Sequence, residues 1–282
     1  MKILITGSKG QLGYDLLRIG IEYELELIGI DYDELDITKE QDVYHLVNEV
    51  EPNAIIHCAA YTAVDKSEDD KEACWAVNVD GTKYLVEAAK RVNAKFMYIS
   101  TDYVFDGEGM TPFLETDKPV PVGYYGLTKH EGEKLVQSAL DDWFVMRISW
   151  VFGVNGHNFV KTMLKLAETR NELNVVADQI GSPTYTFDLA RLLLDMIQTN
   201  KFGIYHATNE GFISWKDFAE EIFKQSKLNI KVNGIATEEY PTRAVRPKNS
   251  RMSKQKLEDA GFAPLPNWKD ALGRYLKELE VE

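Results

Sequence analysis

The sequence predicts an α/β fold, with a doubly wound parallel sheet followed by a smaller, discontinuous C-terminal lobe. Three observations predict it: apolar runs of strand length alternate with helical patterns, glycines follow the first of these runs at once, and no internal repeat or Ser/Gly-rich linker divides the chain. Because strand, loop and helix recur in this rhythm, the strands should run parallel. The residues that matter most should then follow the carboxyl ends of the strands.

Composition and charge limit the class of protein. The 282 residues, 44% of them hydrophobic, suffice for a large packed core. No apolar run reaches the ~18 residues of a membrane span, and the chain begins with a core strand instead of a signal peptide, so we expect a cytoplasmic protein without a membrane partner. A net charge of −13 argues against nucleic acid as a partner. Cys58 and Cys74 lack metal-binding spacing and should be reduced packing residues.

The first stretch, Lys2 to Gly13 (KILITGSKGQLG), predicts a buried strand, a tight turn and the start of a helix. Glycines at positions 7, 10 and 13 would let the chain turn, bring backbone N–H groups against a pyrophosphate and let the helix pack close to the strand. Glycines in this GxxGxxG spacing also occur in ordinary turns, so the pattern alone is weak evidence for a dinucleotide site.

An acidic residue after the second strand strengthens this interpretation. Leu25–Ile30 supplies the strand, and Asp31 follows the glycines at about the 20-residue spacing of a carboxylate that binds the adenosine ribose hydroxyls. The alternative is a plain strand-turn-helix with a surface aspartate. A carboxylate also repels a 2′-phosphate, and no arginine follows Asp31 to offset this, so of NADH and NADPH the sequence favours NADH.

The remaining elements of the first part follow in order. The patterns predict helices at Asp42–Val50 and Asp70–Val92, strands at Ala54–Cys58 and Lys95–Ser100, and a polar loop at Tyr61–Glu68. Asn78, within the second of these helices, is expected to have a structural role. The residues directly after the strands should lie along one edge of the sheet, and they are Gly7, Asp31, Ala60, Thr101 and Trp150.

A further helix, beginning near Gly123, carries Tyr125 and Lys129 one turn apart, so both side chains project from the same face. An ordinary solvated pair is the alternative, but these residues follow Thr101 in a chain that already suggests a dinucleotide site. Together the three side chains can assist the reduction of a ketone by a nicotinamide. Tyr125 can donate a proton to the carbonyl oxygen, Lys129 can lower the pKa of that phenol and hold the nicotinamide ribose, and Thr101 can hydrogen-bond the same oxygen.

The second part of the chain continues the alternation. The patterns predict helices at Asn158–Arg170, Thr186–Ile197, Ser214–Ser226 and Trp268–Leu279, strands at Asn174–Ala177 and Gly203–Ala207, a strand at Arg147–Gly153 that closes the main sheet, and a loop at Asp178–Thr184. Asn158 would cap its helix, whose N-terminus could equally hold a phosphate. We expect a dinucleotide-binding domain at 1–152, with part of 174–210 returning to its sheet, and a substrate lobe at 153–173 and 211–282.

Cations gather in the second part of an otherwise acidic chain. They are Lys161, Arg243, Arg246 and Arg251. Such a group would suit a diphosphate, although ordinary surface salt bridges are the alternative for each residue. Arg246, next to a proline, is the strongest candidate for a diphosphate or sugar contact.

The glycine motif, the Thr after the fourth strand and the YxxxK pair resemble the extended short-chain dehydrogenase/reductase family, which has a Rossmann fold. Longer stretches narrow the resemblance to the dTDP-4-dehydrorhamnose reductases of that family. These stretches are AAYTAVDKSE from Ala59, STDYVFDG from Ser100, YYGLTKHEGE from Tyr124, RISWVFG from Arg147, NFVKTML from Asn158, DQIGSPT from Asp178 and RPKNSRM from Arg246.

The resemblance implies the site residue by residue. The implied catalytic residues are Thr101, Tyr125 and Lys129. The implied cofactor-binding residues are Gly7, Gly10, Gln11, Leu12, Gly13, Asp31, Asp36, Ile37, Ala59, Ala60, Tyr61, Thr62, Ile99, Tyr125 and Lys129. The implied substrate-binding residues are Thr101, Asp102, Tyr103, Trp150, Asn158 and Arg246.

The resemblance also implies an activity, the NAD(P)H-dependent reduction of the 4-keto group of dTDP-4-dehydro-L-rhamnose to dTDP-L-rhamnose, a polysaccharide precursor. A dTDP-sugar would be the partner molecule, and a homodimer and Mg²⁺ are associated with parts of the family, although the sequence has no compact carboxylate cluster for a metal. Two alternatives stay open. One is a reductase of another nucleotide-4-keto-sugar. The other is a non-catalytic regulatory subunit of the same fold, which would be free to lose the three catalytic residues.

Overall fold

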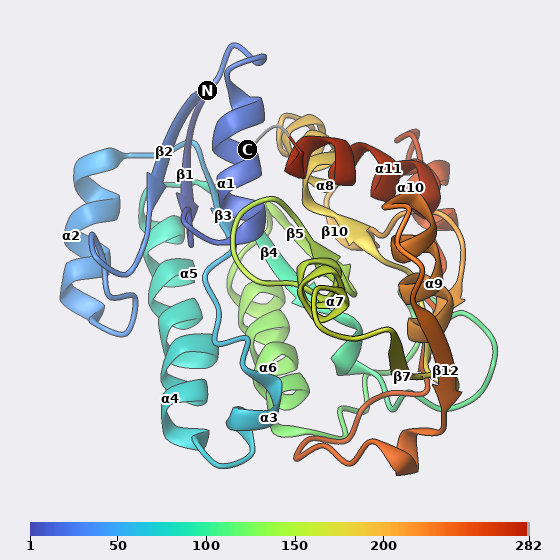
Figure 1. Ribbon diagram of the computed structural model, residues 1–282. Coiled ribbons are helices and arrows are strands. Elements are labelled where there is room, and N and C mark those ends of the chain that lie inside the picture. Colours follow the sequence, from blue (N-terminus) through green and yellow to red (C-terminus); the bar gives the residue numbers. More distant parts are fainter. Residues whose placement is uncertain (281–282) are drawn as a thin grey trace.

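The main sheet of the protein is parallel throughout. In the computed structural model, which describes residues 1–280, six strands follow the order β2-β1-β3-β4-β5-β10 (Figure 1). Their bounds are β1 (Lys2–Thr6), β2 (Glu26–Ile30), β3 (Ala54–His57), β4 (Lys95–Thr101), β5 (Trp143–Ile148) and β10 (Gly203–His206). Buried apolar residues dominate these strands because helices cover both faces of the sheet. The doubly wound α/β fold predicted from the sequence is therefore confirmed.

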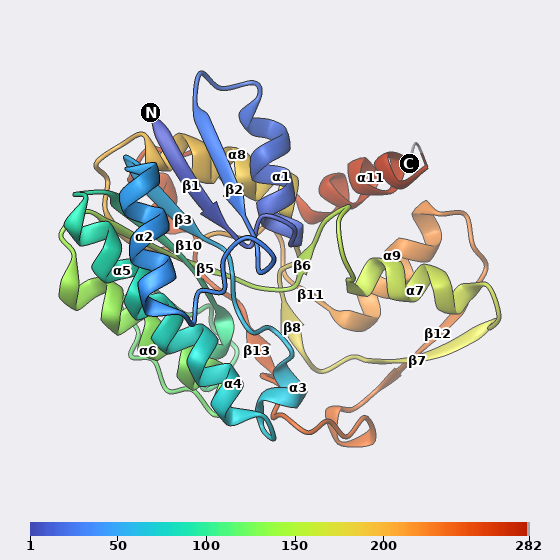
Figure 2. The same cartoon turned by 90° about the vertical axis from the view of Figure 1, so that its left-hand side faces the viewer.

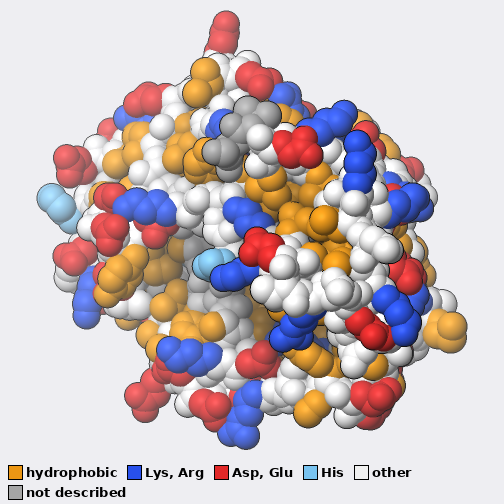
Figure 3. Space-filling model, viewed as in Figure 1, with side chains coloured by type: hydrophobic (Ala, Val, Ile, Leu, Met, Phe, Trp, Pro, Cys, Tyr) orange, Lys and Arg blue, Asp and Glu red, His pale blue; other side chains and the backbone are white. Residues whose placement is uncertain are grey.

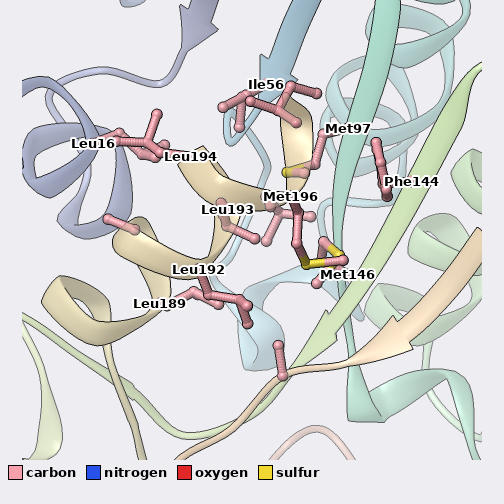
Figure 4. Close-up of a cluster of buried hydrophobic side chains, with 14 of the residues drawn as sticks. Leu16, Ile56, Met97, Phe144, Met146, Leu189, Leu192, Leu193, Leu194 and Met196 are labelled. Atoms are coloured by element: carbon pink, nitrogen blue, oxygen red, sulfur yellow. The ribbon is translucent and has the colours of Figure 1, made fainter. Parts of the chain in front are cut away.

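One face of the sheet is covered by α1 (Gln11–Gly20), α8 (Thr186–Ile197) and α10 (Gln255–Asp259). Leu189, Leu193 and Met196 recur along α8 at three- and four-residue spacing, so they share one helix face. Figure 4 shows this helix packed against side chains of β3, β4 and β5, among them Ile56 and Phe144. The opposite face is covered by α2 (Glu40–Val50), α5 (Thr82–Arg91) and α6 (Tyr124–Ala139).

The predicted helix at 70–92 contains an irregular turn. It divides into α4 (Lys71–Trp75), a π-helical segment (Ala76–Gly81) and α5. Asn78 lies in the π-helical segment, where its side chain bonds both backbone groups of Tyr61 and the Thr128 hydroxyl, as its expected structural role requires. The expected loop at Tyr61–Glu68 was wrong in part, because it contains the short helix α3 (Val64–Ser67).

A second lobe packs beside the carboxyl edge of the sheet (Figure 2). Its helices surround a separate apolar core, and they are α7 (Phe159–Ala167), α9 (Trp215–Gln225) and α11 (Trp268–Leu279). Its strands pair locally, and they are β6 (Val151–Phe152), β7 (Glu172–Val176), β8 (Ile180–Gly181), β9 (Thr184–Tyr185), β11 (Ile213–Ser214), β12 (Lys231–Ile235) and β13 (Asn249–Ser250). The chain passes between the two parts several times. After entering the second lobe, it returns to the main sheet at β10 and to the helices that cover this sheet at α10.

Two sequence expectations were wrong in this part of the chain, and one strand pairing was not predicted. The expected loop at Asp178–Thr184 contains β8 and the first residue of β9, whose two-residue length is too short to produce a pattern. The expected closing strand at Arg147–Gly153 contains only the last two residues of β5 and then β6, which pairs with β9, and the edge of the main sheet next to β5 is β10. The pairing of β12 with β7 was not predicted, since Lys231–Ile235 is neither strongly apolar nor alternating.

The cysteines and the lengths of the helices bear on two predictions from the sequence. Cys58 and Cys74 are both free thiols, as predicted. Within the described residues, no helix combines the length and the apolar character that a bilayer crossing would need.

Candidate active site

The first cavity lies where the strands of the main sheet end. It has a volume of about 790 Å³ and is bounded by the glycine loop, the ends of β2, β3 and β4, and the start of α6. Figure 3 shows a hollow between the two halves of this face, with basic side chains and a histidine beside it. Of the residues predicted for the site, the cavity is lined by Gly7, Gly10, Gln11, Leu12, Gly13, Asp31, Ile37, Ala59, Ala60, Thr62, Ile99, Thr101, Asp102, Tyr103, Tyr125, Lys129 and Trp150.

The glycine loop is a close-fitting turn. Gly7 has φ +69°, and a Cβ built there would lie 2.7 Å from the backbone nitrogen of Ala59. A Cβ at Gly13 would lie 2.2 Å from the carbonyl oxygen of Gly7. Because Gly10 caps α1 without a side chain, the first turn of the helix presents backbone N–H groups towards the cavity. The arrangement therefore suits the pyrophosphate predicted from the sequence.

Lys9, which was not predicted for the site, lies beside Asp31. The carboxylate of Asp31 accepts hydrogen bonds from the backbone N–H groups of Lys9 and Tyr32, both at 2.8 Å. The Lys9 ammonium lies 2.8 Å from Asp33 Oδ2 and 3.0 Å from Glu34 Oε1. This lysine was not predicted because it precedes Asp31 in the chain and comes from the glycine loop, between Gly7 and Gly10.

The three predicted catalytic residues come together at one end of the cavity. Thr101 is the last residue of β4 and is 6% exposed, while Tyr125 and Lys129 lie one turn apart near the start of α6. The ring of Tyr103 meets the ring of Tyr125 edge-on, at a centroid distance of 5.6 Å. The Lys129 ammonium lies 4.1 Å from the centroid of the Tyr98 ring.

The electrostatics of the pair differ from the sequence expectation. Desolvation in the cavity raises the pKa of Tyr125, and the nearby Asp102 carboxylate raises it further. Desolvation also lowers the pKa of Lys129 to about 7, which the charge of Glu133 only partly opposes. A low-dielectric cavity disfavours the phenolate and the ammonium alike. The pKa of the phenol is thus raised, not lowered as expected, in an arrangement where the Lys129 ammonium faces the ring of Tyr98.

A second cavity, of about 1240 Å³, adjoins the first and opens into the C-terminal lobe. The two share Val64, Tyr103 and Trp150. Beyond them lie the aromatic rings of Phe159 and Trp215, which were not predicted for the site. Their signal in the sequence was weak, because an aromatic residue at a helix start is more often part of a core.

Trp150 stands at the junction of the two cavities in a strained conformation. Its φ of +49° is rare for a bulky side chain and costs about 1–3 kcal/mol. Its indole stacks on Trp215 at a centroid distance of 3.6 Å and a plane angle of 13°. Gly181 lies behind it, where a Cβ would come within 2.9 Å of the indole. Packing on both sides therefore fixes the ring between the cavities.

Only one of the four predicted cations lines either cavity. Arg246 lines the second cavity, donates a hydrogen bond of 2.8 Å to the Tyr103 hydroxyl and pairs with Asp65. The other three have local partners: Lys161 bonds the carbonyl oxygens of Val154 and Gly156, Arg243 pairs with Asp69, and Arg251 bonds Asn249.

Three predicted site residues line neither cavity. They are Asp36, Tyr61 and Asn158. Asn158 caps α7 as expected, accepting from the N–H of Lys161 at 3.0 Å, and it also donates to Gln11 Oε1 at 3.1 Å. This residue therefore links the glycine loop to the second lobe. His157 and Gly156, which were not predicted, line the first cavity beside it.

Comparison with known proteins decides the family. The model of the RmlD substrate binding domain family matches residues 1–281. The chain belongs to this family. The resemblance stated from the sequence motifs is confirmed.

Named relatives of the family match along nearly their whole length. The chain is 43% identical to a dTDP-4-dehydrorhamnose reductase of Aggregatibacter actinomycetemcomitans, over 96% of this chain and 97% of that protein. It is 40% identical to the spore coat polysaccharide biosynthesis protein SpsK of Bacillus subtilis, over 98% and 97%. A solved dTDP-4-dehydrorhamnose reductase of Clostridium acetobutylicum superposes with a TM-score of 0.97 at 43% identity, covering 99% of this chain and 100% of that one.

Two further solved structures bear on the site and the fold. A dTDP-4-dehydrorhamnose reductase of Bacillus anthracis, in complex with NADP, superposes with a TM-score of 0.96 at 40% identity, covering 98% of this chain and 99% of that one. A UDP-glucose 4-epimerase of Thermus thermophilus, with NAD, reaches a TM-score of 0.86 at only 19% identity, covering 99% of each chain. The second likeness shows that the fold is shared beyond the family.

Proposed function

We propose that this protein reduces the 4-keto group of dTDP-4-dehydro-L-rhamnose to give dTDP-L-rhamnose, with NADH or NADPH as the reductant. One observation carries the proposal. Thr101, Tyr125 and Lys129 line one end of a cavity that begins at the glycine loop, and that cavity shares Tyr103 and Trp150 with a second, larger one. The names of the relatives support a dTDP-sugar as the substrate.

The residues of the first cavity fit a nicotinamide dinucleotide. A Cβ at Gly7 would collide with the Ala59 backbone, so glycine there lets the loop lie close to the end of β3, and the uncapped start of α1 offers N–H donors to a pyrophosphate. Asp31 would bind the adenosine ribose, while Lys129 would hold the nicotinamide ribose at the other end. When bound, the nicotinamide would supply the hydride that a ketone needs.

The chain's own side chains would supply the proton and hold the carbonyl in place. Tyr125 would donate its phenolic proton to the carbonyl oxygen, since its raised pKa keeps that proton on the phenol at neutral pH. Thr101 would hydrogen-bond the same oxygen from the end of β4. The protonated Lys129 would stabilise the phenolate that forms on Tyr125. General acid catalysis of this kind accelerates a reaction roughly 10²- to 10⁴-fold.

The second cavity would hold the nucleotide-sugar. Trp150, fixed at the junction, would lie against the sugar that faces Tyr125. Of the two arginines that line this cavity, Arg170 and Arg246, we assign the diphosphate to Arg246, because it bonds Tyr103 at the boundary with the first cavity and a guanidinium binds phosphate oxygens through two N–H groups at once. Its present partners, Tyr103 and Asp65, hold it at the boundary between the cavities.

Cofactor preference depends on the balance between Asp31 and Lys9. Asp31 favours an unphosphorylated ribose, so NADH should bind at least as well as NADPH. The ammonium of Lys9, paired with Asp33 and Glu34 beside that carboxylate, would offset part of the repulsion of a 2′-phosphate. Titration of both reduced cofactors measures the balance. A much lower Kd for NADPH than for NADH would contradict the preference.

One assay tests the function directly. Purified protein is supplied with NADH or NADPH and with the 4-keto-sugar carried by dTDP, UDP or GDP, and loss of NADH absorbance is followed. We expect oxidation with the dTDP form and little with the others. A second candidate is a reductase of another nucleotide-4-keto-sugar, which the 40% identity to a spore coat protein favours, and faster turnover of another form would support it. Oxidation with none of the sugars would favour a non-catalytic binding protein.

Three further expectations stay predictions. A homodimer is one, to be checked by sedimentation of the purified protein. Mg²⁺ is another: residues 1–280 contain no group of three or more His, Cys, Asp or Glu side chains arranged for a metal, so we assign it no ligands. The third is a cytoplasmic location.

A further inference from the structure

The hydroxyl group of Thr101 already has a partner for its single proton. Thr101 Oγ1 donates to Asp102 Oδ1 at 3.0 Å and accepts from the backbone N–H of Tyr103 at 3.2 Å. A hydroxyl has one proton to donate and two lone pairs to accept with. As long as the Thr101 hydroxyl donates its hydrogen bond to Asp102, it can accept another hydrogen bond but cannot donate one to a substrate carbonyl.

Asp102 is an unusual neighbour for this hydroxyl. It lines the first cavity and is only 4% exposed. The hydroxyl of Ser250, from β13, faces the Asp102 carboxyl group and lowers its pKa by hydrogen bonding. Burial destabilises the charged form of this carboxyl group.

The charged and titratable groups around Asp102 come from several elements. Tyr125 faces it from α6, and Tyr103 faces it from the turn that follows β4. Behind the Tyr103 hydroxyl lies the pair of Arg246 and Asp65. Ser250 is uncharged, and Lys129 lies further along the same cavity, over Tyr98. Desolvation raises the pKa of Asp102 to about 6, against the lowering effect of its hydrogen bonds.

We propose that Asp102 is a positioning residue that decides, through Thr101, whether the Thr101 proton is available to the substrate carbonyl. The inference rests on the proposed ketone reduction. When Asp102 is ionised, the Thr101 hydroxyl keeps donating its hydrogen bond to the Asp102 carboxylate, because a hydrogen bond to a charged oxygen is stronger than one to a neutral ketone. When Asp102 is protonated, this competition ends and Thr101 donates to the carbonyl oxygen that Tyr125 protonates.

The direction of the pH effect follows. Asp102 carries its proton below a pH of about 6 and loses it above. The turnover of the wild-type enzyme should therefore rise as the pH falls through this value. If Thr101 donates to Asp102, the substrate carbonyl lacks one hydrogen bond of about 1.5 kcal/mol, which corresponds to roughly a tenfold lower kcat. Lys129 also gains its proton as the pH falls, with a pKa of about 7, so the contribution of Asp102 is measured as a ratio between variants.

The kinetic test is a double-mutant cycle at saturating substrate and cofactor. D102N replaces the carboxylate by a neutral, weaker acceptor, T101V removes the hydroxyl, and T101S retains it as the control. We expect the ratio of wild-type to D102N kcat to rise roughly tenfold between about pH 8 and about pH 5. The same ratio in the T101S background should also rise, whereas in the T101V background it should be flat. A rise that persists in T101V would mean that Asp102 acts directly on the substrate and would overturn the proposal, as would a flat ratio in the wild type.

A second readout needs no turnover, so it separates failure of this proposal from failure of the proposed function. The ¹³C shift of the Asp102 carboxyl group is followed against pH in wild type and T101V. Because the Thr101 hydroxyl stabilises the carboxylate, T101V should raise the apparent pKa of Asp102. An unchanged titration would overturn the coupling even if no sugar is reduced. If D102N does not fold, D102S, which is also neutral and polar, takes its place in the cycle.

Discussion

The two cavities of this protein meet at Tyr103 and Trp150, yet they are built differently. The first lies at the ends of parallel strands, and each wall is a short run of consecutive residues, such as Gly7 to Gly13. The second is assembled from segments far apart in the chain, including α7, β7, α9 and the stretch that contains Arg246. The comparison teaches that a cofactor site can be inherent in the fold, whereas a substrate site depends on which loops and helices surround it.

The largest effect is expected where the cavities meet. Tyr125→Phe removes the proton donor and leaves the ring, so kcat should fall roughly 10²- to 10⁴-fold while the Kd of NADH and of dTDP stays near the wild-type value. Stopped-flow turnover and two binding titrations measure these quantities. A variant that keeps near-normal turnover would remove Tyr125 from the mechanism.

A substitution in the first cavity should affect the cofactor alone. Gly7→Ala places a Cβ 2.7 Å from the Ala59 nitrogen, at a φ of +69°. Strain of about 1–3 kcal/mol should raise the Kd of NADH roughly tenfold or more and leave dTDP binding unchanged. Gly109→Ala is the matched control, because its φ is +78° but no atom lies within 4 Å of the added Cβ. Equal loss of dTDP binding in Gly7→Ala would show that the cavities are not separable.

A substitution in the second cavity should have the opposite pattern. Arg246→Gln removes the charge proposed for the diphosphate, so the KM for the nucleotide-sugar should rise roughly tenfold, the value of one charge-assisted hydrogen bond, with the Kd of NADH unchanged. Arg243→Gln is the control, since that arginine is exposed, pairs with Asp69 and lines neither cavity. If both variants behave alike, the effect of Arg246 is one of general charge.

The smallest effect is expected at Trp215, whose ring stacks on Trp150. Trp215→Leu removes an aromatic stack worth about 0.5–1.5 kcal/mol, so the KM for the nucleotide-sugar should rise roughly two- to tenfold. The Kd of NADH should not change, because Trp215 lines only the second cavity. Trp75→Leu, on α4 and lining neither cavity, is the control. A changed NADH affinity would show that the indole pair acts on both sites.

Strand-end positions and i, i+4 spacing predicted part of the first cavity, including Asp31, Thr101 and Tyr125, because they translate directly into neighbouring side chains, and the family resemblance supplied the rest of the predicted lining. The sequence did not predict Lys9, whose ammonium reaches Asp33 and Glu34 across the loop, since that contact depends on how the two loops fold together. The expected low pKa of Tyr125 was wrong because burial, which spacing does not reveal, acts on both Tyr125 and Lys129. In the second cavity, Phe159 and Trp215 could not be predicted, because the ring contacts of Trp215 with Trp150 and with Phe159 come from tertiary packing.

The most direct test of the account follows the hydride across the junction of the two cavities. Protein is incubated with 4-deuterated NADH, carrying the label on the transferred position, and with dTDP-4-dehydro-L-rhamnose, and the product sugar is examined by NMR. We predict dTDP-L-rhamnose with one deuterium, located at C4. An unlabelled product, a label at another carbon, or no reduced sugar at all would contradict the claim that the glycine-loop cavity delivers a hydride to a ketone held in the second lobe.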